Sequence, residues 1–154
     1  MKPTTMVRLW SLQNVFLLWL IRPKIHVLNA DQCIVRVPLN WITRRKDIRA
    51  MYLGTLCMGA DVAAGLIAFQ SVAEKKQRIN FIFKDMKAEF LKRAEGEVWF
   101  TNNDGPLIQE LITRALASGE REEATVHVTA TVPEKLGEEA VAKFELTLSI
   151  KRRS

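Results

Sequence analysis

The segment Ala50–Ala73 limits the fold most strongly, because it is long, almost wholly apolar and carries one charged residue, Asp61. Apolar side chains occupy nearly every face that a helix here would have, so protein must enclose it on most sides. Small residues keep its surface thin: Gly54, Gly59, Ala60, Ala63, Ala64, Gly65 and Ala68. We therefore predict a central helix that a sheet, or a second copy of the helix, approaches closely.

Asp61 makes this helix a candidate for function as well as for structure. A carboxylate among apolar neighbours is costly to ionise without partners, and such groups occur at functional sites. The same residue argues against a membrane span, where a charge at the midpoint costs about 2.5–3.5 kcal/mol. Strand patterns follow in the sequence, which also favours a core helix over a transmembrane one.

Composition and charge exclude several classes of protein. A chain of 154 residues suits a single core, and a hydrophobic content of 48% argues against disorder. The net charge of +6 is scattered, so we interpret most cations as solvated, with attraction to a phosphate-bearing ligand as the alternative. Basic residues do not alternate with aromatic ones at strand spacing, and nucleic-acid binding is not predicted.

Cysteine and histidine usage predicts neither a disulfide framework nor a metal site. Cys33 and Cys57 are the two cysteines, and we interpret them as reduced thiols of a cytoplasmic protein. His26 and His127 have no cysteine or carboxylate at metal-ligand spacing. We predict no metal and no cofactor.

An apolar segment, Leu9–Ile21, precedes the folded core and is followed by Pro23, which predicts a short helix. Its length falls short of the roughly 20 residues that cross a bilayer. We expect this helix to pack on the domain as a lid. A peripheral membrane contact or a dimer contact is the alternative, because Trp10 and Trp19 lie between flanking cations.

Alternating apolar residues predict five strands in the rest of the chain. Near Lys84 and Asp85 the apolar residues switch from odd-numbered to even-numbered positions of the predicted strand. This switch predicts a bulge, and therefore a curved sheet. Asp104, Gly105 and Pro106 begin an amphipathic surface helix that Gly119 ends. The predicted strands are 31–39, 78–91, 97–102, 125–132 and 140–152, with 133–139 as a hairpin connection.

This order of elements, and a motif in the central helix, resemble the hotdog-fold thioesterase superfamily, in particular its PaaI-like (phenylacetate-pathway-type) acyl-CoA thioesterases. In that family a His-Gly-Gly turn opens the helix, and an Asp follows the second Gly by seven residues within Ala-Asp-x-Ala. Gly54 and Ala60–Ala63 keep that spacing, whereas Tyr52 and Leu53 replace the His and the first Gly. The stretch Lys87–Lys92 and Gly96 is also similar to a family strand and turn.

The resemblance implies an α+β hotdog fold, in which a curved antiparallel five-stranded sheet wraps one long central helix. An N-terminal helix and an inserted surface helix are added to it. We expect residues 1–30 to form an N-terminal helical segment and residues 31–154 the hotdog domain. We also expect a homodimer or a dimer of dimers, because the family pairs the Gly of one subunit with the carboxylate of the other.

The implied activity is hydrolysis of an acyl-CoA or acyl-carrier thioester, with Asp61 as catalytic base or nucleophile and the backbone N–H of Gly54 as oxyanion donor. Within one helix these residues are roughly 10 Å apart, too far to act on one carbonyl. Asp61 as a buried structural residue is the alternative role. A non-catalytic hotdog protein that binds an acyl thioester or lipid is the alternative function, and a membrane-associated binding module is a third.

Because CoA carries phosphate groups, we expect Arg and Lys side chains at the mouth of the substrate pocket. The loop before the central helix supplies Asn40, Arg44 and Arg45 as substrate-binding candidates, and Lys92 and Arg93 form a second cluster. Tyr52 is a further candidate, as a hydrogen-bond donor to the substrate or as a packing residue. Solvated loop charges are the alternative interpretation of both clusters.

Overall fold

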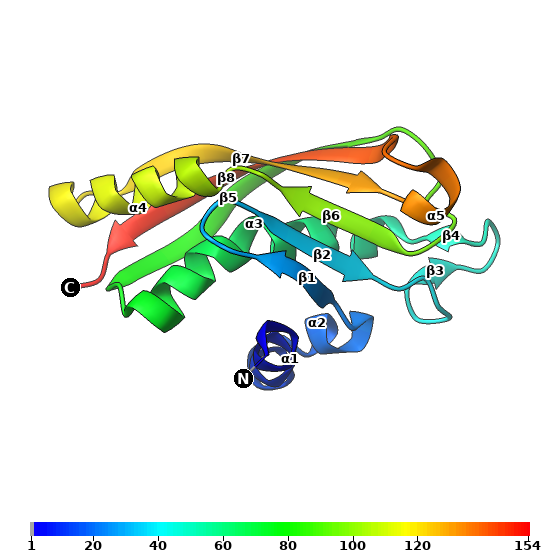
Figure 1. Cartoon of the computed structure of the whole chain (residues 1–154), viewed down its shortest axis with the longest axis horizontal. Coiled ribbons are helices and arrows are strands. Elements are labelled where there is room, and N and C mark those ends of the chain that lie inside the picture. The colour runs from blue at the N-terminus through cyan, green and yellow to red at the C-terminus, as the bar shows by residue number, and fades with distance from the viewer. Residues whose placement is uncertain (1) are drawn as a thin grey trace.

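The computed structural model describes residues 2–154 and shows one antiparallel sheet curved around the long helix α3 (Leu53–Lys75) (Figure 1). The strand order is β1-β2-β6-β7-β8-β5. Its strands are β1 (Lys24–Leu28), β2 (Cys33–Val37), β5 (Ile79–Phe90), β6 (Val98–Asn102), β7 (Glu122–Thr131) and β8 (Ala140–Arg152). The predicted α+β architecture, with a central helix wrapped by a curved antiparallel sheet, is confirmed.

The predicted number of strands is wrong, because the sheet has six strands and a separate hairpin adds two more. The sixth strand, β1, pairs with β2 and lies in the segment that the sequence assigned to the N-terminal helical part. The small hairpin joins β3 (Arg44–Arg45) to β4 (Ala50–Met51). Strands this short, or with mixed burial as in β1, leave little alternation for a sequence pattern to reveal.

Helix α3 begins at Leu53 rather than at Ala50, because Ala50 and Met51 form the strand β4 and Tyr52 is extended. Met51 donates to the carbonyl of Ala94 at 2.9 Å, and Tyr52 donates to that of Thr43 at 2.9 Å. Tyr52 then takes the N-cap position in an extended conformation. The predicted bulge near Lys84 and Asp85 is confirmed, since the pairing of β5 with β8 shifts between Phe83 and Asp85.

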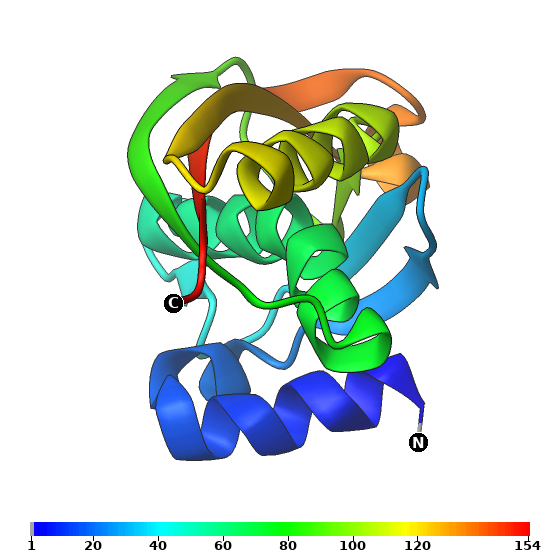
Figure 2. The same cartoon turned by 90° about the vertical axis from the view of Figure 1, so that its left-hand side faces the viewer.

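Two helical layers cover the rest of the core. The N-terminal helix is broken at Val15 into α1 (Pro3–Asn14) and α2 (Phe16–Ile21), which lie beneath α3 (Figure 2). Helix α4 (Gly105–Ser118) begins after Asp104 and ends at Gly119, where φ is 70°, as predicted. The connection between β7 and β8 holds one short helix, α5 (Pro133–Leu136).

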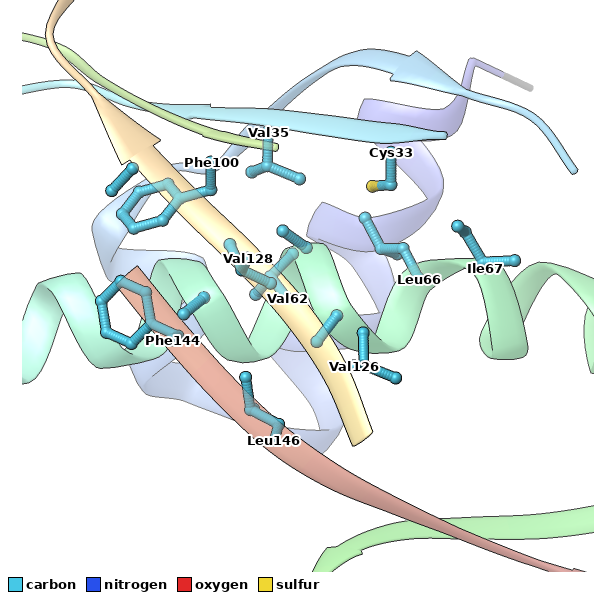
Figure 3. Close-up of a cluster of buried hydrophobic side chains, with 14 of the residues drawn as sticks. Cys33, Val35, Val62, Leu66, Ile67, Phe100, Val126, Val128, Phe144 and Leu146 are labelled. Carbon is cyan, nitrogen blue, oxygen red and sulfur yellow. The ribbon is translucent and has the colours of Figure 1, made fainter. Parts of the chain in front are cut away.

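The core lies between α3 and the concave face of the sheet, where side chains from β2, β6, β7 and β8 meet the helix (Figure 3). The small residues of α3 allow a close approach. A β-carbon added to Gly59 would lie 2.3 Å from the ring of Phe100 on β6. Helix α3 is long and apolar enough to span a membrane, yet it is the enclosed core helix of this fold.

Candidate functional site

Asp61 lies at a cavity of about 280 Å³ that α3 lines together with the helices α1 and α2 and with Phe81 of β5. It is the one charged residue among the described residues that line this cavity. The other lining residues are almost all apolar: Val7, Trp10, Ser11, Val15, Leu17, Leu18, Met58, Val62, Gly65, Leu66, Phe69 and Phe81. Asp61 therefore presents a single carboxylate to an apolar space.

The surroundings of Asp61 raise the pKa of its carboxyl group above the ordinary aspartate value, because burial among apolar atoms disfavours the charged form. The side chain still reaches solvent through the open side of the cavity. No hydrogen bond or ion pair within residues 2–154 compensates the charge. A carboxylate with a raised pKa that water can reach suits a general base.

Ser11 on α1 is a second polar group at this cavity, and sequence analysis missed it. The side chain is fully buried, and its Oγ has no hydrogen-bond partner within the described chain. An unused buried hydroxyl is costly, so a ligand or water in the cavity is its natural partner. A serine within an apolar helix carries no sequence signal of such a role.

The N-terminus of α3 holds Gly54, the predicted oxyanion donor, and Tyr52, a predicted substrate-binding residue. No side chain caps this end, and the first helical hydrogen bond is donated by Leu56 to the carbonyl of Tyr52 at 3.1 Å. The N–H groups before Leu56, including that of Gly54, are therefore donors at the positive end of the helix dipole. The exposed ring of Tyr52 covers Gly54, because a β-carbon there would lie 2.5 Å from the ring.

A second cavity, of about 460 Å³, lies at this end of α3. It is lined by Tyr52 and by three of the predicted cations, Arg45, Lys92 and Arg93. Arg45 also pairs with Asp47, and Lys92 pairs with Glu139. The structure thus gathers residues from the loop before α3 and from the end of β5 around one opening, although they are almost fifty positions apart in the sequence.

Asn40 and Arg44 do not line that cavity. The side-chain oxygen of Asn40 accepts the backbone N–H groups of Ile42 and Thr43 at 2.9 and 3.2 Å, which stabilises the turn before β3. Arg44 is exposed on the small hairpin. In the structure Asn40 therefore stabilises a turn, and Arg44 occupies a solvent-exposed strand position.

The fold resembles those of solved bacterial proteins over nearly their whole length. A protein of unknown function from Chlorobaculum tepidum has a TM-score of 0.82 at 11% identity, over 97% of this chain and 94% of that one. A Pseudomonas aeruginosa protein described as a probable thioesterase has a TM-score of 0.77 at 20% identity, over 99% and 97%. A thioesterase from Haemophilus influenzae has a TM-score of 0.70 at 12% identity, over 99% and 92%.

A six-stranded sheet wrapped around one apolar helix places the chain among the hotdog-fold proteins, the fold of these thioesterases. None of the curated proteins matches the sequence significantly. Residues 11–150 match the family model of the domain of unknown function DUF4442, and the chain belongs to that family.

Proposed function

We propose that this protein is an acyl-CoA thioester hydrolase whose active site is shared between two subunits. The observation that carries the proposal is the position of Asp61. Its carboxylate is accessible to solvent, has a raised pKa and lies at a cavity that is otherwise almost wholly apolar. The thioesterases of the same fold support it. A cytoplasmic location agrees with the two cysteines, which are both unpaired.

In the proposed reaction, Asp61 removes a proton from a water molecule as the water oxygen attacks the thioester carbonyl carbon. The negative charge that develops on the carbonyl oxygen is stabilised by the N–H of Gly54 from the second subunit, at the N-terminus of its α3. The carbonyl bond then re-forms as the carbon–sulfur bond breaks, and the leaving sulfur takes the proton from Asp61. The products are a carboxylic acid and a free thiol.

Release of that thiol is the direct test of the proposal. We expect wild-type protein to release CoA from members of a panel of acyl-CoAs, detected with a thiol reagent, with the acyl chain bound in the apolar cavity. Tight binding of acyl-CoA without thiol release would establish the alternative, a non-catalytic acyl-binding protein. Absence of both binding and release would remove acyl thioesters as the ligand.

The free edge of β5 supports the homodimer that a shared site requires. Strand β5 ends the sheet, and its exposed apolar side chains include Ile82, Met86 and Phe90. An unpaired edge with apolar side chains tends to pair with another strand. We expect sedimentation to show a dimer or larger assembly at micromolar concentration. Ile82→Lys should shift the association state toward monomer, whereas the control Ala117→Lys on the exposed face of α4 should leave it unchanged. A monomeric wild type would contradict a shared site.

The cations at the N-terminus of α3 are proposed to bind the phosphates of CoA. Arg45→Ala combined with Arg93→Ala should raise KM for acyl-CoA by about tenfold, since each removes a charged hydrogen-bond donor. We expect kcat, and hydrolysis of a short thioester without the nucleotide, to stay unchanged. Arg44→Ala is the matched control, because Arg44 lies outside the cavity. Equal losses on both substrates would contradict phosphate binding.

A further inference from the structure

The helices α1 and α2, which lie at the bottom of the molecule in Figure 2, expose a group of large apolar side chains. Their exposed fractions run from 38% to 61%. We call this group the α1–α2 apolar surface, and it comprises Leu9, Trp10, Leu12, Val15, Phe16 and Leu17. So many large apolar side chains on two consecutive helices mark an interaction surface.

Positive charge accompanies this surface. The first acidic residue of the chain is Asp31, whereas Lys2, Arg8, Arg22 and Lys24 come before it. Helices α1 and α2 hold Arg8 as their one charged residue. The whole segment from Lys2 to Ala30 therefore combines exposed apolar side chains with cations alone.

Three of these cations meet in one cavity of about 470 Å³ beside α1. Arg8, Arg22 and Lys24 line it together with Arg36 of β2, and none of the described residues that line it is acidic. The other lining residues are Thr4, Pro23, Ile25, Pro38 and Asn40. Four cations without a carboxylate in their cavity form a site for an anion.

One of these four cations, Arg36, also has a buried donor without an acceptor among the described residues. Its guanidinium lies over the ring of Trp99 at 5.2 Å, and Nη1 is 3.6 Å from Glu97 Oε1. The Nε donor is buried and has no hydrogen-bond partner in residues 2–154. A buried donor without an acceptor is costly, and a phosphate oxygen accepts from guanidinium groups readily.

We propose that α1 and α2 dock this protein on an anionic phospholipid bilayer. The α1–α2 apolar surface enters the interfacial region, as the apolar faces of membrane-surface helices do. Lipid phosphates bind the cations of the adjacent cavity, and the negative surface potential attracts the remaining ones. Charge favours a bilayer over a second copy, because a two-fold contact through this surface would bring two sets of cations together.

Docking there would also connect the bilayer with the cavity of Asp61. Trp10, Val15 and Leu17 belong to the α1–α2 apolar surface and also line that cavity. An acyl chain could then move between lipid and cavity without crossing water. This consequence rests on the proposed function, whereas docking itself does not.

Vesicle flotation with the full chain tests docking without any thioester, so its failure is distinguishable from a failure of hydrolysis. The vesicles are phosphatidylcholine alone, or phosphatidylcholine with about one quarter phosphatidylglycerol. One variant carries Leu9→Gln, Leu12→Gln and Phe16→Gln, which keep helix propensity. A second carries Arg8→Gln, Arg22→Gln and Lys24→Gln. The matched control removes the same charge elsewhere with Arg114→Gln, Lys135→Gln and Lys143→Gln.

We expect wild type and the control to float with the anionic vesicles, and each docking variant to bind at least about tenfold more weakly. Unchanged melting temperatures would show that the variants fold. Absence of wild-type flotation, or equal binding of the control and the cation variant, would overturn the proposal. The proposal would also be overturned if wild type did not bind vesicles and the variant of Leu9, Leu12 and Phe16 sedimented as a smaller species than wild type. The α1–α2 apolar surface would then join two copies of the chain.

Discussion

Asp61→Asn is expected to lower kcat/KM for acyl-CoA hydrolysis by about 10²–10⁴-fold, because the amide cannot take a proton from the attacking water. In wild type, kcat/KM should fall as the pH drops through the pKa of Asp61. That acid limb should lie above the ordinary aspartate value of about 3.9, since burial raises this pKa. Steady-state thiol release at a series of pH values measures both effects.

Thermal melting of the same variant separates catalysis from folding. A raised pKa means that the folded protein holds this proton more tightly than the unfolded chain. The resulting stabilisation is complete below the unfolded-state pKa and is lost as the pH rises through the folded-state pKa. Asp61→Asn should therefore melt at a higher temperature than wild type at pH 7, and the difference should shrink in acid.

Asp31→Asn is the control, because this exposed side chain makes no hydrogen bond or ion pair within the described residues. It should keep wild-type activity and melting. Full hydrolysis by a folded Asp61→Asn protein would make the carboxylate structural and remove the proposed base. Hydrolysis would then have to use another group as the base.

Gly59→Ala is expected to destabilise the protein by about 1–3 kcal/mol, which is the usual cost of overpacking a well-packed core. The added methyl group would lie 2.3 Å from the ring of Phe100, which is itself fully buried. Either the ring or α3 must move. Chemical denaturation measures the loss as a shift of the unfolding midpoint at an unchanged slope.

Gly65→Ala is the matched control on the same helix. A β-carbon at Gly65 meets Phe83 at 3.4 Å, which is ordinary contact, and the change should stabilise α3 by about 0.5–1 kcal/mol. Shortening the facing side chain with Phe100→Leu should recover part of the loss in the Gly59→Ala background, as a double-mutant cycle would show. Equal stability of Gly59→Ala and Gly65→Ala would contradict the close approach of helix and sheet.

The sequence by itself determined the central elements of the fold. The near-continuous apolar character of the α3 segment required a wrapped helix, and its small residues predicted the close contact now seen at Gly59. Apolar alternation located the long strands, and its change of parity located the bulge after Phe83. These features were readable because each depends on neighbours along the chain, where periodicity reports which face is buried.

The tertiary structure alone decided which distant residues share a surface. Arg45 and Arg93 meet at one cavity, while the side chain of Asn40, also predicted to bind substrate, accepts backbone N–H groups of Ile42 and Thr43 in a turn. Ser11 became a cavity residue only because α1 packs beneath α3. Strand β1 forms because β2 offers it an edge, not because its own residues alternate. Contacts between distant segments depend on how the elements pack. The periodicity of one segment does not indicate which distant element it will pack against.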